Sequence, residues 1–524
     1  MIFTYDLTWI LLLPVLGAVA AIAAPVRYAR WLALLFSAAT FALSMAIFFR
    51  MVANGNFGDL NHPADFTPQI TWIDFTAKNV HFKIDYFLGV DGLSMPLVIL
   101  NALLTMLAII GGWEKARVKE YMALLLLLET GVMGVFISLD LLLFFLFWEV
   151  ELAPMFLLIG IWGSDVMKHG MPGRIYSAWK FLLYTFFGSI FMLAGILLLY
   201  FRAGGNTASM QFFSTHMQFL AGVSPIFGWS WQLLIFLLIF LAFAIKIPMF
   251  PFHTWLPDAH TDAPTEVSVI LAGVLLKMGA YGLIRVCLTL LPGGVQEFAP
   301  WLAVIAAINI IYGAGICLVQ TDMKKLIAYS SVSHMGVILL GVAAAAAGFG
   351  GMAFRQAALT GATIQMFSHG LITGMLFFCV GVIYDHAHTR EIAVFGGVAK
   401  KMPLLATLFT FAGLASLGLP GLAGFVAEYI TFTASYQVWT VVTVISVFTM
   451  ILTASYLLWM LKRVFYGPFN TKWNWLPDAN WREAIPLVSL AVFIVFVGIF
   501  PSVLIQLITP ALKAILHTGT VIIH

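Results

Sequence analysis

The stretch that decides the fold is 235-IFLLIFLAFAIKIPMFPFHTWLPDAH-260, a long apolar run with a lysine near its middle and two prolines directly after it. An ammonium group at the bilayer centre costs about 2.5–3.5 kcal/mol on insertion scales. Pro248 and Pro251 interrupt the helix and free backbone polar groups that hydrocarbon cannot satisfy. Both costs are tolerable only where the segment lines a buried, partly hydrated path, so Lys246 predicts a route for ions or protons.

The composition indicates an all-α polytopic membrane protein. Hydrophobic residues make up 62% of the chain and charged residues 9%, and the mean hydropathy is +1.00. A net charge of +3 does not favour nucleic-acid binding. Cys287, Cys317 and Cys379 are widely separated, which excludes a cysteine-only iron–sulfur site and a disulfide framework.

Apolar segments of roughly 20 residues recur along the whole chain. The first has no basic region before it, so we interpret it as a retained span rather than a signal peptide. Residues 50–88 are expected to form a short hairpin or loop on the outer face. We expect about 14 transmembrane helices, near 8–24, 31–49, 89–111, 120–138, 140–161, 178–200, 230–257, 266–289, 299–318, 323–345, 357–383, 403–434, 437–461 and 485–509.

The distribution of basic residues predicts the orientation. Most of the 26 lysine and arginine residues lie on connections that follow odd-numbered spans, and this side is expected to face the cytoplasm. An even number of spans then places both termini outside.

Two spans are interrupted, at KIPMFPF in 230–257 and at LGLPGLAGF in 403–434. Paired interrupted helices five spans apart are typical of inverted-repeat transporters with sites near the midplane. We therefore expect discontinuous helices 7 and 12 in two inverted five-helix repeats. The predicted divisions are 1–112 for helices 1–3 with the outer loop, 113–290 for the first repeat, 291–463 for the second repeat and 464–524 for helix 14.

Ionisable residues lie at membrane depth in five predicted spans besides the one that contains the quoted lysine. Polar residues inside spans are functional by default, although paired charges can also pin helices together. We interpret Glu149 and Lys246 as a coupled pair, and histidine suits a relay because it exchanges protons near neutral pH. The candidate proton-relay residues are Glu149, Lys246, Lys277, His334, His369 and Glu428.

Several other residues leave alternatives open. Glu151 follows Glu149 by two positions, so it is expected on another helix face as a second proton site or an interface residue. His253 and His260 either guide protons or cap the interrupted helix. Asp140 is interpreted as a helix cap. The G-x-G-x-x-A match beginning at Gly348 lacks a preceding strand, which argues against dinucleotide binding.

Four motifs carry a family resemblance. These are residues 242–285, TDMKKLIAYSSVSHMG at 321–336, FFLFWEVELAPMF at 144–156 and LPGLAGFVAEY at 419–429. Together they resemble the antiporter-like membrane subunits of respiratory complex I, and within these the NuoM type, called subunit 4 in mitochondria. A glutamate at Glu428, the histidine in SVSHMG and a chain end soon after the fourteenth span favour this type.

The resemblance implies a non-redox subunit of a proton-translocating NADH:quinone oxidoreductase. It implies that this chain binds no cofactor and that NADH, FMN, iron–sulfur clusters and quinone belong to partner subunits. The expected partners are other membrane-arm subunits, especially the neighbouring antiporter-like ones, together with lipid and protons. Carried over by motif, Glu149 and Lys246 resemble the coupling pair, Lys277 the central lysine, the two histidines the connecting groups and Glu428 the terminal proton site.

Related assemblies share most of these motifs. The alternatives are a subunit of an Mrp-type cation/proton antiporter, of an energy-converting hydrogenase, or of the photosynthetic complex I-like enzyme. A haem or copper oxidase is disfavoured because only His334 and His369 are clearly at membrane depth. The expected location is a bacterial inner membrane, with mitochondrial inner and thylakoid membranes as alternatives.

Overall fold

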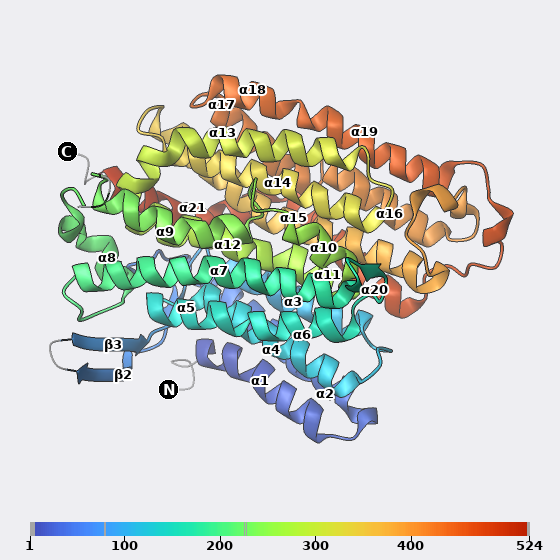
Figure 1. Cartoon of the computed structure of the whole chain (residues 1–524), viewed down its shortest axis with the longest axis horizontal. Helices are drawn as coiled ribbons and strands as arrows, with labels where there is room; N and C mark the ends of the chain where they lie inside the picture. Colours follow the sequence, from blue (N-terminus) through green and yellow to red (C-terminus); the bar gives the residue numbers. More distant parts are fainter. Residues whose placement is uncertain (1–5, 78–79, 225, 227, 521–524) are drawn as a thin grey trace.

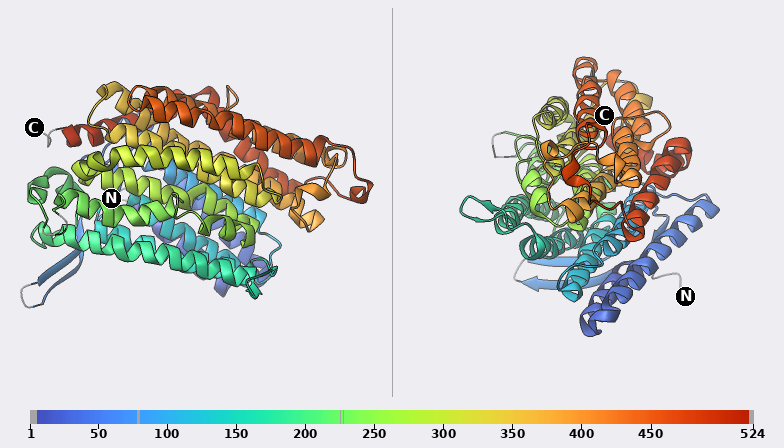
Figure 2. Two further views of the ribbon diagram at one scale, coloured as in Figure 1. Left: turned by 45° about the horizontal axis from the view of Figure 1, so that its top comes forward. Right: turned by 90° about the vertical axis from the view of Figure 1, so that its right-hand side faces the viewer.

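Nearly parallel helices form one bundle, and a β-hairpin projects from one of its ends (Figures 1 and 2). The computed structural model describes residues 6–77, 80–224, 226 and 228–520. Within these residues the chain is mostly helical, and the only sheets are two-stranded. The all-α class is confirmed.

The N-terminal helices lie at one edge of the bundle (Figure 1). They are α1 (Asp6–Ala23), α2 (Val26–Asn54), α3 (Met95–Gly111) and α4 (Val118–Ile137). Between α2 and α3, β2 (Ile70–Ala77) pairs antiparallel with β3 (Val80–Tyr86), and β1 (Asp65–Phe66) pairs with β4 (Gly89–Val90). The hairpin predicted within residues 50–88 is confirmed.

The next elements are α5 (Leu141–Val150), α6 (Leu152–Trp162), β5 (Met167–Lys168), β6 (Met171–Pro172), α7 (Gly173–Arg202), α8 (Met210–Thr215) and η2 (Met217–Leu220). Asp140 accepts hydrogen bonds from the N–H groups of Leu142 and Leu143, at 2.9 and 3.0 Å. It therefore caps α5, as predicted. The apolar segment beyond this cap is divided at Glu151, where α5 ends and α6 begins.

The first interrupted helix consists of α9 (Trp231–Lys246) and α10 (Trp255–Asp262), so the helix ends at the lysine itself. Neighbouring side chains satisfy the freed backbone groups. Asn309 accepts from the Phe250 N–H at 2.6 Å and donates to the Pro248 carbonyl at 3.3 Å. The Trp255 indole N–H donates to the Ile245 carbonyl at 2.9 Å. These contacts make a break at membrane depth tolerable.

The helices in the middle of the bundle are the most buried. They are α14 (Met323–Ala346), α15 (Met352–Ala387) and the rod formed by α11 (Thr265–Ile270), the π-helical η3 (Leu271–Leu275), α12 (Leu276–Gly282) and the π-helical η4 (Leu283–Leu288). Between the rod and α14, α13 (Pro292–Cys317) is less buried, at 44%. The apolar windows of the rod and of α15 are 100% buried and that of α14 is 94% buried, against 28% for α2 and α20.

The second interrupted helix consists of α16 (Pro403–Ser416) and α17 (Ala423–Tyr436). Gly418 and Gly421 adopt φ values of 82° and 90° in the break, which glycine reaches without strain. The remaining elements are η5 (Ile392–Val394), η6 (Val398–Lys400), α18 (Thr440–Val447), α19 (Thr449–Leu461), η7 (Lys462–Tyr466), η8 (Thr471–Trp473), α20 (Trp481–Ile499) and α21 (Pro501–Thr520).

Eleven helices among the described residues are long and apolar enough to cross a membrane. Shorter apolar helices such as α3 and the first halves of the two interrupted helices lie outside that count, so the number of 14 spans stays a prediction. The prediction of one continuous helix over residues 485–509 is wrong, because α20 ends at Ile499. A new helix, α21, begins at Pro501, because proline disfavours helical conformation in the residue before it.

Candidate functional site

Lys246 forms a buried ion pair at the end of α9. Its Nζ donates to the Glu151 carboxylate, and the two side chains are 1% and 0% exposed. The ammonium also lies 5.5 Å from the centre of the Trp148 ring and 5.4 Å from that of Phe181. A counter-ion and aromatic faces together hold the charge that the sequence places inside the membrane.

The direct partner of Lys246 is therefore Glu151. Among the described residues no hydrogen bond or ion pair joins Glu149 to Lys246, although their charges interact, so the predicted coupling of Glu149 and Lys246 stays a prediction. Residues two apart on a helix point in different directions, and here Glu151 points into the bundle whereas Glu149 is only half-buried. Gly131 allows this approach, because a Cβ there would lie 3.0 Å from the Glu151 backbone nitrogen. Glu149 is only partly buried and lies near Ser189 and within the electrostatic reach of Lys246.

Lys277 lies on α12 between the two π-helical turns and is fully buried. Its Nζ donates to the Ala272 carbonyl of its own helix and contacts His369 Nδ1 at 2.7 Å. No described carboxylate forms an ion pair with it. Lys277 and His369 are therefore a direct donor–acceptor pair between the rod and α15.

A second pair continues from the first. His334 on α14 lies beside His369, with ring centres 5.7 Å apart, and its Nδ1 is 3.0 Å from the Glu428 carboxylate on α17. Its Nε2 lies 3.3 Å from Ser416 Oγ, at the end of α16. Lys277, His369, His334 and Glu428 thus form a row that ends at the second helix break.

A small cavity adjoins this row. It has a volume of about 10 Å³ and is lined by both histidines, Ser416, Glu428 and the Gln365 side chain, among others. This volume is close to the minimum for one water molecule, and the lining supplies the polar partners that a water needs. A single water could join the two imidazole rings.

Lys246 and Lys277 are not joined directly. Among the described residues, no hydrogen bond or ion pair connects them, and aliphatic contacts such as Gly279 against Ile247 lie between their helices. The site therefore has two parts, an ion pair at the first break and a hydrogen-bonded row that reaches the second.

His253 and His260 are both buried, and neither caps a helix. Both ring nitrogens of His260 lack a hydrogen-bond partner among the described residues, and the ring stacks on Phe377 with centres 4.5 Å apart. The capping alternative is therefore wrong for both, and a role in guiding protons stays a prediction. Gly348 lies in the loop between two helices, with no strand before it.

Sequence reasoning missed four buried ionisable residues. Arg285 on η4 pairs with Asp91 before α3, with Nη2 2.6 Å from Oδ1, and both are about 2% exposed or less. Glu266 on α11 accepts from the Tyr121 hydroxyl at 2.8 Å. Glu129 is fully buried on α4. Each stands inside or next to an apolar run, so a systematic search for charged residues in predicted spans would have found them.

Charged side chains also cluster around the connection between α3 and α4, which lies at the end of the bundle opposite the β2–β3 hairpin (Figure 1). Lys115, in the connection between α3 and α4, lies 3.3 Å from Glu266. The Glu266 carboxylate raises the pKa of Lys115 above its ordinary value, so this lysine stays charged. Lys115, Lys324, Asp385 and Arg390 line a cavity of about 120 Å³.

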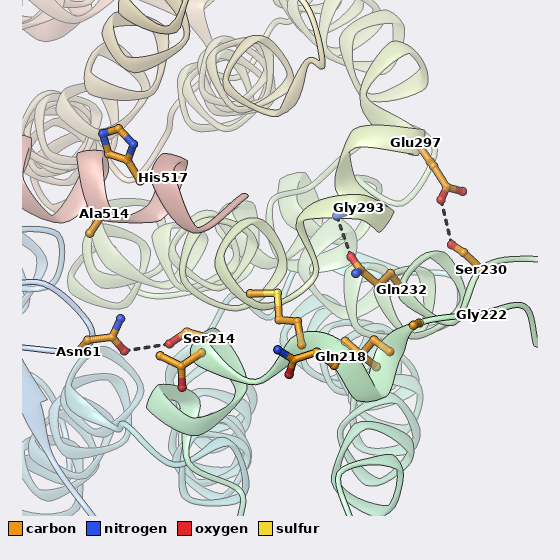
Figure 3. A pocket seen from close by; sticks show the side chains of 14 residues that line it. Asn61, Ser214, Gln218, Gly222, Ser230, Gln232, Gly293, Glu297, Ala514 and His517 are labelled. Atoms are coloured by element: carbon orange, nitrogen blue, oxygen red, sulfur yellow. Dashed lines mark hydrogen bonds between the residues drawn. The ribbon is translucent and has the colours of Figure 1, made fainter. Parts of the chain in front are cut away.

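A wider pocket of about 900 Å³ lies away from the row of titratable groups (Figure 3). Its walls come from the segment after α7, the start of α13 and the helix α21, at the hairpin end of the bundle (Figures 1 and 3). Ser230 donates to Glu297 there at 2.9 Å. None of the six candidate relay residues lines it.

The described residues contain no group of three His, Cys, Asp or Glu side chains with the arrangement of metal ligands. The three cysteines are free and buried in different helices. The contacts of Lys277 with His369 and of His334 with Glu428 support proton exchange among Lys, His and Glu side chains.

Comparisons with known proteins agree on one family. Residues 138–453 match the family described as NADH:quinone oxidoreductase/Mrp antiporter, TM. NADH-quinone oxidoreductase subunit M of Rhodobacter capsulatus is 42% identical over 93% of this chain and 90% of the relative. NAD(P)H-quinone oxidoreductase chain 4 of Gloeobacter violaceus is 38% identical over 96% and 91%.

A solved structure agrees with these relatives. A chain in the structure of respiratory complex I from Thermus thermophilus with bound NADH aligns with a TM-score of 0.83 and 27% identity, covering 98% of this chain and 99% of that chain. The resemblance drawn from the four sequence motifs is thereby confirmed.

Proposed function

This chain belongs to the NADH:quinone oxidoreductase/Mrp antiporter membrane family, and we propose that its buried Lys, His and Glu side chains carry protons across the membrane. It is a membrane subunit of the proton-translocating NADH:quinone oxidoreductase, complex I. The observation that carries the proposal is the row from Lys277 to Glu428, with polar contacts of 2.7 and 3.0 Å at its two ends.

Proton transfer along the row follows from the chemistry of its members. A proton on Lys277 Nζ passes to His369 Nδ1, and the Nε2 proton of that ring passes to a water in the small cavity. The water protonates His334 on Nε2, and the Nδ1 proton of His334 moves to Glu428. Each imidazole accepts at one nitrogen and donates at the other, which is why histidine suits these two positions.

Lys246 provides the coupling step. Two carboxylates, Glu149 and Glu151, act on one ammonium, and the structure has the ion pair with Glu151. We propose that Lys246 alternates between these partners when a neighbouring subunit changes the field. Because a buried ammonium without a counter-ion is strongly disfavoured, separation from Glu151 favours release of its proton.

The direction of transport rests on the distribution of basic residues. If the lysine-rich connections face the cytoplasm, both termini lie outside and Glu428 lies in the outer half, in a bacterial inner membrane. Labelling of a cysteine introduced near the N-terminus from one side of the membrane checks this orientation. A label that enters only from the cytoplasmic side would reverse it.

The remaining assignments are part of the same proposal. The divisions 1–112, 113–290, 291–463 and 464–524 separate the N-terminal helices, two inverted repeats and the C-terminal helix. This chain supplies no redox group, and NADH, FMN, iron–sulfur clusters and quinone are held by partner subunits. The neighbouring antiporter-like subunits are the partners in the membrane.

Glu428→Gln tests the end of the row. Glutamine keeps the shape and a hydrogen bond to His334 but cannot ionise. In vesicles containing the assembled complex, we expect NADH-driven proton translocation to fall by roughly tenfold or more, in the range of a lost proton-transfer group. The matched control is Gln437→Glu. It exchanges an amide and a carboxylic acid directly after α17, outside the row from Lys277 to Glu428. Wild-type translocation by Glu428→Gln would move the exit elsewhere.

A further inference from the structure

Glu129 is a buried carboxylate that the proposed relay does not use. It lies on α4, eleven residues after Val118, which is about 17 Å along the helix at 1.5 Å per residue. Its side chain is 0% exposed, and neither carboxylate oxygen has a hydrogen-bond partner among the described residues. No described Lys, Arg or His forms an ion pair with it.

Two neutral polar side chains from adjacent helices lie next to Glu129, and a third follows on the same face of α3. Asn101 on α3 donates from Nδ2 to the Glu129 backbone carbonyl at 3.1 Å, and Thr105 follows one turn later on the same face. Ser37 on α2 is the hydroxyl next to the Glu129 carboxylate. Asn101 Oδ1, Thr105 Oγ1 and Ser37 Oγ also lack partners in the described part of the chain.

The unpartnered hydroxyls of Ser37 and Thr105 differ from other buried hydroxyls on α2 and α4. Other buried hydroxyls on the same helices donate to the carbonyl four residues earlier, as Thr40 does to Phe36 and Thr130 to Leu126. The hydroxyls of Ser37 and Thr105 do not, so neither is held by a carbonyl of its own helix. The group then holds an amide oxygen and two carboxylate oxygens as acceptors, but only two hydroxyl donors.

One additional proton on Glu129 would supply the missing hydrogen-bond donor among these side chains. An isolated ionised carboxylate in a medium of low dielectric costs tens of kcal/mol by Born solvation, so such a group becomes neutral. We propose that Glu129 binds a proton and keeps it throughout turnover. As a neutral acid it donates to Asn101 Oδ1 and accepts from the hydroxyls of Ser37 and Thr105, which joins α2, α3 and α4 through one polar contact.

The opposite face of α4 contacts the segment that carries Glu151. Gly131 lies two residues after Glu129 and packs directly against the Glu151 backbone, at the ion pair with Lys246. Glu129 is therefore a positioning residue, because it fixes the helix against which Glu151 is held. This part of the inference rests on the proposed function, whereas the bound proton does not.

The test compares Glu129→Gln with Glu129→Leu in the assembled complex. Glutamine keeps a donor and an acceptor, so NADH-driven proton translocation is expected to stay within about twofold of wild type. Leucine leaves Asn101, Ser37 and Thr105 without a partner, so translocation is expected to fall by several-fold, roughly the effect of one unsatisfied buried group. Recovery in Glu129→Gln then shows that the polar contact matters and the charge does not.

An infrared measurement tests the proton itself. At alkaline pH, the difference spectrum between wild type and Glu129→Gln is expected to contain the C=O stretch of one protonated carboxylic acid. Its absence, or translocation by an assembled Glu129→Gln complex reduced by about tenfold, as for a proton-transfer group, would overturn the proposal. Wild-type translocation by Glu129→Leu would overturn the positioning role. Glu428→Gln measured alongside reports on the proposed function separately.

Discussion

At the scale of single residues, the protein contains two ways of holding a buried amine. Lys246 has a carboxylate and two aromatic rings around it, whereas Lys277 has a backbone carbonyl and an imidazole. An ion pair stabilises the charged form of an amine. A neutral imidazole allows the proton to leave. The first environment suits a residue that responds to its partner, and the second suits a residue that passes a proton on.

The two glutamates near Lys246 are expected to behave differently. Glu151→Gln removes the direct counter-ion and leaves a buried charge, a change that costs about 3–5 kcal/mol, so assembly and translocation should both fall. Glu149→Gln leaves the ion pair intact, so the complex should assemble while translocation falls. Blue-native electrophoresis and vesicle assays measure the two properties.

The control for this pair is the double variant Glu151→Gln with Lys246→Met. Because it removes both charges, it should recover assembly without recovering translocation. Equal assembly of Glu151→Gln and wild type would show that Glu151 is not the counter-ion. Normal translocation by Glu149→Gln would remove that residue from the coupling step.

At the scale of elements, the two helix breaks form the site. Proline and glycine signals in the sequence predict both breaks, and the lysine ends the first helix as expected. Central charges in the predicted spans also identify the four members of the row. Helical spacing predicts that Glu149 and Glu151 lie on different faces, but it does not say which of these faces meets Lys246. That choice depends on tertiary packing, including the space at Gly131.

Asn309 shows how a neighbouring helix maintains the first break. Asn309→Leu removes the acceptor of the Phe250 N–H and the donor to Pro248, and each unsatisfied buried group costs about 1–3 kcal/mol. We expect faster thermal inactivation of proton translocation. Ile310→Leu is the matched control on the same helix, since a volume-conserving exchange usually costs below about 1.5 kcal/mol. Equal inactivation rates for the two variants would contradict this role of Asn309.

At the scale of the whole molecule, the helices of the proposed relay lie in the middle and apolar helices surround them. Lys277, His334 and His369 lie on the three most buried segments among the predicted spans, and α1, α2 and α20 expose much of their apolar surface at the edges (Figures 1 and 2). This arrangement excludes lipid from the charges. It also leaves the partly buried Glu149 near the surface, where a neighbouring subunit can act on it.

The measurement that tests the central claim most directly is proton translocation by the Lys277→Arg complex in sealed vesicles. Arginine keeps the positive charge but is not deprotonated in proteins, so it separates carrying a charge from exchanging a proton. The row from Lys277 to Glu428 predicts a complex that assembles but translocates protons poorly. Wild-type translocation by the assembled Lys277→Arg complex would contradict the account and leave Lys277 as a structural cation.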